Sequence, residues 1–418
     1  MALLLIFDAI IRRRHSAIEL PQPGLRAEGK RPVLSVVLPV RNEEAHVGAV
    51  LAQLEAQDYP RDRFEVIVAV GTSTDRTVQV VEAFRQRTAM SLRQFDNPMQ
   101  LSSAGRNIGA RNACGDYVIF IDGHCTIPSK TLLSDAASLF QETGADCLCR
   151  PQPLTGIGNS PFQNVIAHVR ASRLGHALDS TIYSTKEGPV NPSSAGAMYR
   201  KSVFDHVGYY DERFDACEDV ELNHRIFKAG LSSYISPKLT VVYQPRKDLR
   251  SLWRQMTRYG RGRFQLIQKH HDAFSFGQII PSGLLLWLLF GGIASLFWRP
   301  FLVPFAPCLA AYAVVLLGFS IGLGVRYGLR YALFAPFTYL TIHLGLGAGF
   351  LMEGLRLGHP TRPEMQAIPK TYVKSRSLEP DAGCMTCSSL SSRISGLSET
   401  GRALAGQPSL TDLPWRGG

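Results

Sequence analysis

The stretch LSVVLPVRNEE, residues 34–44, joins a run of aliphatic and β-branched residues to a polar cluster. The apolar run, Leu34 to Leu38, predicts a buried strand. After the polar cluster, in which Asn42 is a candidate helix N-cap, apolar residues recur on one helical face, at Val47, Val50, Leu51 and Leu54. The stretch therefore predicts a strand, a polar turn and a helix in that order.

The same order of elements recurs further along the chain. Phe64 to Val70 predicts a second buried strand, followed by a polar turn and a helical pattern, and Tyr117 to Ile121 predicts a third strand. Strands that alternate with helices are typical of a parallel sheet, in which ligands bind beyond the carboxyl ends of the strands. Three polar clusters lie at those ends: Arg41-Asn42-Glu43, Ser73-Thr74-Asp75 and Asp122-Gly123-His124.

Asp122 and His124 form a candidate metal site. A carboxylate directly after a hydrophobic strand has no structural purpose in the core, so Asp122 is available to bind a metal ion. The imidazole of His124, two residues further on, can reach the same metal ion. Oxygen and imidazole ligands suit Mn²⁺ as well as Mg²⁺. The alternative interpretation is an aspartate in a turn beside a histidine on the surface.

Two adjacent acids, Glu218 and Asp219, open a predicted helix that continues to Lys228. One could take a proton from an acceptor hydroxyl while the other anchors the structure, because neighbours on a helix point in different directions. Alternatively, both could be partners of the helix dipole. Arg106, which precedes the third strand, could contact a phosphate or be an ordinary surface arginine.

Five motifs together resemble glycosyltransferase family 2, whose members have the GT-A fold. They lie between Val33 and Tyr243 in the family's order: VVLPVRNEE at 36–44, STDRT at 73–77, RNIG at 106–109, DGH at 122–124 and ED at 218–219. The Asp-x-His form and the apolar C-terminal region are most similar to membrane-anchored exopolysaccharide glucosyltransferases of the succinoglycan type. The expected fold is a GT-A domain, a Rossmann-like mixed α/β sheet, followed by transmembrane helices.

The resemblance implies an inverting transfer from a nucleotide diphosphate sugar, usually a UDP-sugar, with a divalent cation (Mn or Mg) as cofactor. Asp122 would match the first aspartate of the family's metal motif, with His124 in place of the second. Asp219, beside Glu218, would match the catalytic base. The residues expected to bind the nucleotide sugar are Pro39, Arg41, Asn42, Glu43, Asp75, Arg106, Asn107 and Asp122.

Two features depart from the family pattern. Val70 stands where the family often has an acidic residue that helps to hold the base, so the donor nucleotide is left open. The segment Gln255-Met256-Thr257-Arg258-Tyr259 is similar to the Gln-x-x-Arg-Trp motif of processive polysaccharide synthases, and its tyrosine keeps a stacking face. The residues expected to bind the acceptor are therefore Gln255, Arg258 and Tyr259.

The chain of 418 residues has a net charge of +11, and its densest basic run, Arg246 to Lys269, directly precedes an apolar region. This order predicts amphipathic interfacial helices over 246–275 on a membrane surface, rather than a nucleic-acid partner. Residues 279–352 hold three apolar stretches, each near the ~20 residues that cross a bilayer: Ile279–Phe297, Phe301–Gly324 and Tyr331–Met352. The first stretch could instead be an interfacial or re-entrant segment, and a re-entrant one would return the tail to the cytoplasm.

These features divide the chain into an interfacial or flexible segment (1–30), the GT-A domain (31–245), the interfacial helices, the membrane region and a disordered tail (358–418). Because nucleotide sugars are made in the cytoplasm, the catalytic domain of this multi-pass protein is expected at the cytoplasmic face of the cell membrane. The expected partners are a nucleotide-diphospho-sugar donor, a lipid-linked saccharide acceptor, the membrane and other glycan-assembly proteins.

The leading hypothesis is the addition of a single sugar to a lipid-linked saccharide, for an exopolysaccharide or surface glycan. Two other enzymatic hypotheses are transfer onto polyprenyl phosphate and processive polymerisation. The small number of apolar stretches argues against a channel that extrudes a growing chain. A hypothesis of another class is an inactive membrane scaffold that keeps the fold.

Overall fold

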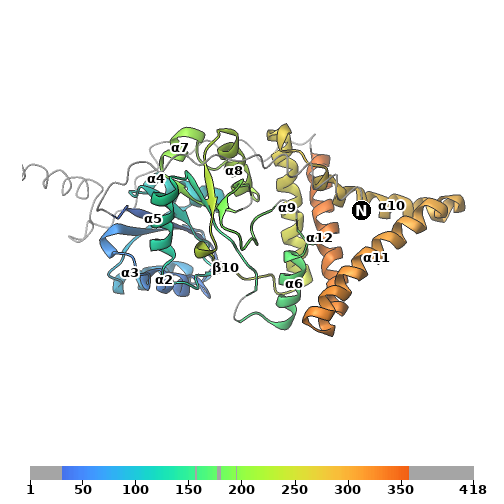
Figure 1. Ribbon diagram of the computed structural model, residues 1–418, viewed down its shortest axis with the longest axis horizontal. Coiled ribbons are helices and arrows are strands. Elements are labelled where there is room, and N and C mark those ends of the chain that lie inside the picture. The colour runs from blue at the N-terminus through green and yellow to red at the C-terminus, as the bar shows by residue number, and fades with distance from the viewer. Residues whose placement is uncertain (1–30, 156–157, 177–179, 194, 357–418) are drawn as a thin grey trace, which may run out of the picture. The chain divides into compact units, whose positions relative to one another are not determined.

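The structure is a computed structural model that describes residues 31–155, 158–176, 180–193 and 195–356 (Figure 1). The predicted N-terminal segment 1–30 and the predicted tail 358–418 lie outside the described residues. The remaining predictions, from the first strand to the last apolar stretch, fall on residues that can be compared with the structure.

In the described part of the chain, eight strands form one mixed sheet in the order β3-β2-β1-β4-β8-β6-β9-β7. β1 pairs in parallel with β2 and β4, and β2 pairs in parallel with β3, whereas β8 is antiparallel to both of its neighbours. The strands are β1 Leu34–Val40, β2 Phe64–Gly71, β3 Ser91–Asn97, β4 Tyr117–Phe120, β6 Cys147–Cys149, β7 Gly188–Pro189, β8 Gly196–Arg200 and β9 Ser233–Ile235. The predicted mixed α/β sheet is confirmed.

Helices cover both faces of the sheet, because successive side chains of a strand point to opposite sides. Val36 and Leu38 of β1 pack in one core with α2, α3 and α5, while Val37 packs in the other with α4, α7 and α8. At Gly109 of α4, an added Cβ would lie 2.1 Å from a methyl of Val37, so α4 packs closely on β1. The helices are α2 Val47–Glu55, α3 Thr77–Arg87, α4 Ser102–Asn112, α5 Leu132–Thr143, α7 Ser202–Val207 and α8 Glu218–Lys228.

A second, two-stranded sheet lies beside the end of β4. β5, Cys125–Thr126, follows the Asp122-Gly123-His124 turn directly, and it pairs antiparallel with β10, Val242–Tyr243. The ring of His124 consequently meets the edge of Tyr243, with 4.7 Å between the ring centroids. This pairing holds the turn after β4 against the chain that leads into the C-terminal helices.

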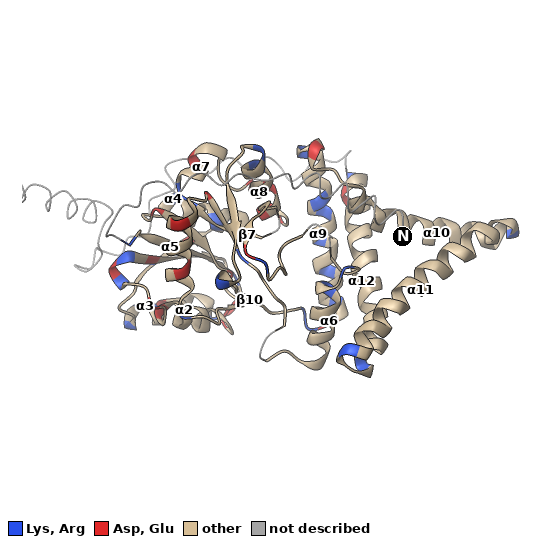
Figure 2. Cartoon of the chain, viewed as in Figure 1, with Lys and Arg blue, Asp and Glu red and all other residues tan. Residues whose placement is uncertain are grey.

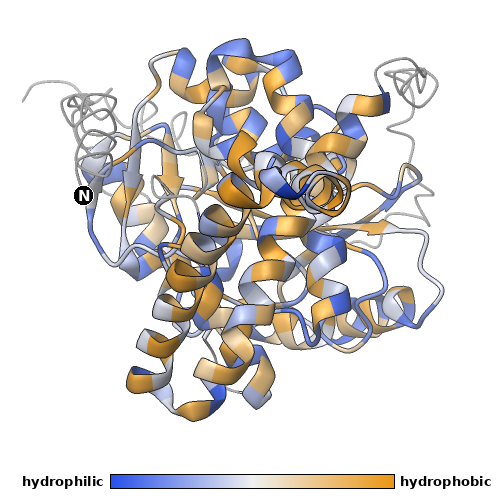
Figure 3. Cartoon of the chain, turned by 90° about the vertical axis from the view of Figure 1, so that its right-hand side faces the viewer, coloured by the Kyte–Doolittle hydropathy of each residue, from blue (hydrophilic) through white to orange (hydrophobic). Residues whose placement is uncertain are grey.

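The C-terminal helices follow the predicted boundaries closely. Among the described residues, three helices are long and apolar enough to cross a membrane, and Figure 3 shows hydrophobic residues along them. The preceding helix α9 carries the predicted basic run as one continuous helix, where Figure 2 shows repeated blue bands. These elements, with one further helix that packs against them, are α6 Pro161–Ala171, α9 Leu249–Lys269, α10 Phe276–Phe297, α11 Leu302–Tyr327 and α12 Leu329–Leu355.

Two local details differ from the sequence analysis. The prediction that Asn42 caps the first helix is wrong, because α2 begins at Val47 with His46 at its N-cap position. Asn42 instead has a φ of 54°, in the left-handed region that asparagine tolerates better than most residues. The edge strand β3 was not predicted, since its sequence SLRQFDN has little apolar periodicity.

Candidate active site

Arg106 of α4 joins two of the predicted carboxylates. Its Nη2 donates to Oδ1 of Asp122 over 3.0 Å, and its Nη1 donates to Oε1 of Glu218 over 3.1 Å. The side chain of Arg106 is 12% exposed, and its guanidinium lies 5.5 Å from the ring centroid of Tyr210. The end of β4 and the start of α8, which are distant in the chain, therefore meet at the guanidinium of Arg106.

The pKa values of the two carboxylates bound by Arg106 shift in opposite directions. Burial alone would raise the pKa of Asp122, but the neighbouring Arg106 and His124 hold it below its ordinary value. For Glu218, burial outweighs the attraction of Arg106 and, with the nearby charge of Asp219, raises the pKa to about 7. Asp122 therefore stays ionised at neutral pH, whereas Glu218 titrates near it.

Asp219 lies beside this pair with its carboxylate less constrained. The residue before the helix, Cys217, has a φ of 64°, which turns the chain sharply into α8. One carboxylate oxygen of Asp219 accepts from the backbone N–H of Val220 over 2.8 Å. The charge of Asp219 also acts on Arg106 and on Tyr259 of α9, so the carboxylate lies among the other predicted site residues.

His124 is held by Glu43 in an orientation that suits a metal ligand. Nδ1 of His124 lies 2.8 Å from Oε1 of Glu43, and because a carboxylate can only accept, Nδ1 carries the hydrogen. The other nitrogen, Nε2, is buried and has no hydrogen-bond partner in the described part of the chain. Metal-ligating histidines commonly bind through one nitrogen while the other donates to a carboxylate. The orphaned nitrogen and the ionised Asp122 therefore fit the predicted divalent cation.

Protonation would compete with a cation at this site. Burial alone would lower the pKa of His124, but its hydrogen bond to Glu43 and the charge of Asp122 raise it above its ordinary value. A cation needs the neutral imidazole, so binding at Nε2 would displace a proton.

The loops after β1 and β2 are bound tightly to each other. The backbone N–H of Asn42 donates to Ser73, and the side chain of Asn42 accepts from the N–H of Thr74 over 2.8 Å. Asp75 accepts from the N–H of Glu44 over 3.1 Å and from both the N–H and the hydroxyl of Thr77. The predicted nucleotide-binding loops thus form one unit in which most polar side chains already have partners.

The other predicted nucleotide-binding residues have different surroundings. Both amide hydrogens of Asn107 are used, by the carbonyl of Tyr210 and by Glu212, and its side-chain oxygen accepts from the N–H of Tyr210. Through these three hydrogen bonds, the buried Asn107 holds the loop before α8 in place. Pro39 lies within β1, and the exposed Arg41 extends along Gly71. Of these three, only Arg41 has its polar groups in solvent.

The three predicted acceptor-binding residues lie on α9, next to the chain that leads into α8. Gln255 is buried, and its amide donates to the hydroxyl of Tyr259 over 3.2 Å. Arg258 donates three hydrogen bonds to Asp215, and the shortest of them, to the backbone carbonyl oxygen, is 2.6 Å. An added Cβ at Gly262 would lie 2.4 Å from the carbonyl oxygen of Ala216, so α9 packs directly on that segment.

Two buried arginines were not predicted. Arg150 follows β6 and donates to the carbonyl oxygen of Phe120 over 2.9 Å, and its charge acts on Asp122. Arg170 of α6 lies 3.5 Å from the side-chain oxygen of Gln255. A cation inside an otherwise apolar segment is the signal that could have identified both, since an arginine is rarely buried without a partner.

A second group of candidate metal ligands lies at the other end of α8. Ligand atoms of His224, His270 and Asp272 all lie within 4.8 Å of one another. Asp272 is also 3.0 Å from the ammonium of Lys228, and His270 is 2.9 Å from Glu221. Asp272 and His270 thus have protein partners, as Asp122 has in Arg106. The buried Nε2 of His224, like that of His124, has no hydrogen-bond partner among the described residues. This group is a second candidate metal site.

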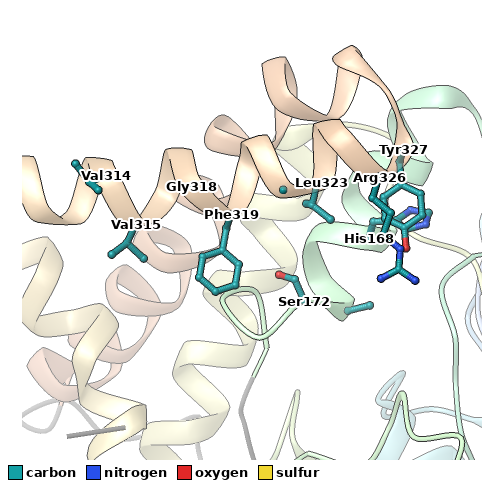
Figure 4. Close-up of a pocket in the computed structure, with 11 residues that line it drawn as sticks. His168, Ser172, Val314, Val315, Gly318, Phe319, Leu323, Arg326 and Tyr327 are labelled. Carbon is teal, nitrogen blue, oxygen red and sulfur yellow. The ribbon is translucent and has the colours of Figure 1, made fainter. Parts of the chain in front are cut away.

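A groove of about 650 Å³ lies away from these residues, between α6 and α11. Figure 4 shows its apolar wall along α11, with His168, Arg326 and Tyr327 gathered at one end. No predicted site residue lines it. An added Cβ at Gly318 or Gly322 would meet nothing within 4 Å, so the wall at these glycines is open.

A mixed sheet with carboxylates beyond the ends of its parallel strands is the architecture of GT-A glycosyltransferases, and in this chain it is followed by three long apolar helices. Residues 35–208 match the family described as glycosyl transferase family 2. The chain belongs to this family, and it is a glycosyltransferase that uses a nucleotide sugar. The family resemblance that the sequence predicted is confirmed.

Relatives and a solved structure agree with this assignment. The succinoglycan biosynthesis protein ExoA of Rhizobium meliloti (strain 1021) is 30% identical over 323 residues, which cover 76% of this chain and 94% of that protein. A dolichyl N-acetyl-alpha-D-glucosaminyl phosphate 3-beta-D-2,3-diacetamido-2,3-dideoxy-beta-D-glucuronosyltransferase of Methanococcus voltae is 25% identical over 264 residues, covering 61% of this chain and 80% of its own.

The fold itself is similar to that of the mannosyltransferase PcManGT from Pyrobaculum calidifontis, solved in complex with GDP-Man and Mn²⁺. The TM-score is 0.54 at 18% identity, and the match covers 84% of this chain and 94% of that one. At this identity the likeness supports the GT-A fold alone. The metal and the donor in that structure are properties of the mannosyltransferase.

Proposed function

We propose that this glycosyltransferase moves a sugar, with inversion, from a UDP-sugar to a lipid-linked saccharide at the cytoplasmic face of the cell membrane. The product would be an intermediate of an exopolysaccharide or surface glycan. The observation that carries the proposal is the bridge from Arg106 to Asp122 and Glu218, with Asp219 beside it. This geometry would bring Asp122, which acts on the donor through the cation, close to Asp219, which acts on the acceptor hydroxyl.

Asp219 is the base in this mechanism. Its carboxylate would take the proton from the acceptor hydroxyl while the hydroxyl oxygen attacks the anomeric carbon from the face opposite the leaving group. The bond from the anomeric carbon to the diphosphate oxygen breaks, and its electron pair leaves with the nucleotide diphosphate. Glu218 is paired with Arg106, whereas the carboxylate of Asp219 accepts from the backbone N–H of Val220, so Asp219 is the acid that an acceptor hydroxyl could reach without breaking an ion pair.

Asp122 and His124 would hold the divalent cation. Such a cation neutralises the charge that develops on the departing diphosphate. Glu43 would fix the imidazole so that Nε2 faces the ion. On the other side, Arg106 would keep the carboxylate of Asp122 ionised and oriented.

The acceptor would approach along α9. Gln255 and Tyr259 lie next to the start of α8, and the charge of Asp219 acts on Tyr259. The groove between α6 and α11 supports the proposal that the acceptor carries a lipid. This groove is apolar along α11 and has Arg326 at one end (Figure 4). An arginine at the end of an apolar groove suits a lipid chain that ends in a phosphate group. The M. voltae relative is named for a dolichyl-linked sugar phosphate acceptor.

One assay separates this proposal from its alternatives. The purified full chain is given Mn²⁺, a panel of nucleotide sugars, and either polyprenyl phosphate or a polyprenyl-diphosphate-linked saccharide, and the products are weighed by mass spectrometry. Addition of one sugar to the saccharide is expected. Transfer onto polyprenyl phosphate alone, or long polymers from one enzyme, would support the other enzymatic hypotheses instead. No UDP binding in titration calorimetry and no product would favour an inactive scaffold.

The lipid groove has a separate test. Gly318→Phe places a ring in the open groove, so the KM for the lipid-linked acceptor should rise several-fold, about the effect of losing one or two buried methylenes. The matched control is Leu317→Phe, because Leu317 is 50% exposed and does not line the groove. The KM for the nucleotide sugar should stay constant in both variants. Equal acceptor KM values for the two variants would remove the groove from the acceptor site.

A further inference from the structure

The last of the three apolar helices, α12, differs from the other two in its surroundings. In its most apolar 18-residue stretch, 39% of the residues are buried inside the protein, against 17% in α10 and 11% in α11. A helix that crosses a bilayer beside few neighbours leaves most of its surface to lipid, and the low burial of α10 and α11 fits such a position. The helices that pack against α12 therefore limit the positions that it can take relative to the bilayer.

One side of α12 packs along α9 at backbone contact. An added Cβ at Gly349 would lie 2.0 Å from the carbonyl oxygen of Thr257, and one at Gly345 would lie 2.9 Å from Cβ of Met256. Further along, Arg261 of α9 donates to Glu353 over 2.9 Å. The contacts advance together in residue number on both helices, so α9 and α12 run side by side in the same direction (Figure 1).

The first half of α12 packs on α6 and the loop after it. The ring of Tyr331 meets His168 with 5.3 Å between centroids, the hydroxyl of Tyr339 is 2.8 Å from that of Ser172, and His343 bonds the carbonyl oxygen of Leu174. Contacts with α6 and α9 thus extend from Tyr331 to Glu353. At 1.5 Å per residue this is about 33 Å, close to the full length of the helix.

α9 cannot lie inside the hydrocarbon of a bilayer. It carries a cation on nearly every turn, as the blue bands in Figure 2 show, at Arg250, Arg254, Arg258, Arg261, Arg263 and Lys269. Arg258 and Lys269 are bound to Asp215 and Glu221 of the catalytic domain. A helix whose second half packs on this basic part of α9, and whose first half packs on α6, cannot cross the membrane without drawing those charges into the bilayer.

We propose that α12 lies along the membrane surface, between the catalytic domain and the bilayer, and that only α10 and α11 of the described helices cross. The face of α12 opposite α9 carries one apolar stripe, in which Leu333, Phe337 and Met352 are 57%, 59% and 47% exposed. Its partner is the lipid surface of the near leaflet. α10 and α11, with 22 and 26 residues, are each long enough to span the ~30 Å core, so together they cross and return.

The distribution of charge fits this arrangement. Arg326 and Arg330 flank the junction of α11 and α12, and Arg356 follows α12, whereas the turn between α10 and α11 holds the single cation Arg299. Positive residues collect on the cytoplasmic side of membrane proteins. A returning hairpin places all of these cations except Arg299 on the side of the catalytic domain. A re-entrant first stretch, the alternative that the sequence left open, would return the tail to the same side; in this proposal α12, rather than the first stretch, is the apolar segment that does not cross.

Protease protection tests the proposal directly. One epitope tag is added after Gly418 and another, in a separate version, between Trp298 and Arg299, and sealed vesicles with the catalytic domain outside are treated with protease. The C-terminal tag should be lost, while the tag in the turn should survive until detergent is added. Protection of the C-terminal tag, with loss only after detergent, would overturn the proposal, because α12 would then cross.

A matched pair of charge substitutions tests the position of α12 itself. Val314 is 69% exposed near the middle of α11, and Phe337 is exposed on α12. Val314→Lys should reduce the amount of membrane-inserted protein at least tenfold, whereas Phe337→Lys should leave it within twofold of the wild type, because its ammonium can reach the headgroups. Equal losses for both variants would show that Phe337 lies as deep as Val314 and would exclude a surface position.

Discussion

Two groups of polar residues at the carboxyl ends of the strands looked alike in the sequence but differ in the structure. In the loops after β1 and β2, Asn42 and Asp75 already accept hydrogen bonds from neighbouring backbone groups. In the cluster after β4, by contrast, Nε2 of His124 has no partner among the described residues, and Asp122 shares a single arginine with Glu218. Groups without protein partners are the ones available to a ligand.

The difference indicates that the two groups of residues have different functions. The loops after β1 and β2 would shape the donor pocket, because their side chains fix the backbone. The cluster after β4 would carry the chemistry, because the buried Nε2 of His124 has no partner among the described residues and two carboxylates share one arginine, so a bound cation could complete the cluster. The following predictions on catalysis, stability and nucleotide binding test this division, from the largest expected effect to the smallest.

Asp219→Asn should reduce the rate of sugar transfer by about 10²–10⁴-fold, the usual contribution of a general base. The amide keeps the size of the side chain but cannot take the proton. Titration calorimetry with UDP and Mn²⁺ should give nearly the wild-type affinity. The control is Glu218→Gln, which should retain more activity because Glu218 is paired with Arg106. A reversed order of the two variants would move the base to Glu218.

Arg106→Met should destabilise the protein by about 3–5 kcal/mol at neutral pH, since it leaves two buried carboxylates without their cation. The effect depends on pH through Glu218. Its pKa in the folded protein, about 7, is above its ordinary value of 4.5, so folding binds a proton and the stability from this group is lost as pH rises through 7. In the variant the pKa should rise further. Thermal unfolding in detergent at pH 5.5 and pH 8 measures both effects.

If the melting temperature of Arg106→Met falls by the same amount at both pH values, the loss is one of packing rather than of charge. Arg106→Lys keeps a cation and serves as the control, although it cannot bridge both acids in the same fork geometry.

Asp122→Ala should weaken the binding of UDP in the presence of Mn²⁺ by about 10–100-fold, and it should leave the affinity without metal nearly unchanged. The reason is that Asp122 acts on the nucleotide through the cation. Asp75→Ala is the matched variant in the donor loops, where the carboxylate organises backbone N–H groups. It should weaken UDP binding equally with and without Mn²⁺. An unchanged response of Asp122→Ala to Mn²⁺ would refute the metal site.

The sequence predicted those parts of the structure whose signals are local. The helix from Glu218 to Lys228 was placed to the residue, and the strand after Tyr117 was placed within one residue, because apolar periodicity and a terminal glycine mark such elements. The pairing of Arg106 with Glu218 joins residues 112 positions apart, and no local pattern encodes it. The burial of Arg150 and the packing of α12 on α9 are likewise properties of the folded chain.

The same limit explains why the site was predicted only in outline. A motif identifies which residues gather at the strand ends, but it does not say which of their hydrogen bonds are already made. Asn107 was expected in the nucleotide pocket, yet its amide is used by Tyr210 and Glu212. The turn at Asn42 looked like a helix cap, and the backbone there adopts a left-handed conformation instead.

Asn107→Ala should therefore have the smallest effect on catalysis. Both of its amide hydrogens and one lone pair of its oxygen are bonded inside the protein, so truncation leaves the partner groups of Tyr210 and Glu212 unsatisfied. The expected cost is about 1–3 kcal/mol of unfolding free energy, measured by chemical denaturation in detergent. The dissociation constant for UDP, measured below the unfolding transition, should change less than twofold. A tenfold weaker affinity at unchanged stability would instead place Asn107 among the groups that meet the ligand, and the contrast between satisfied and open polar groups would no longer separate scaffold from chemistry.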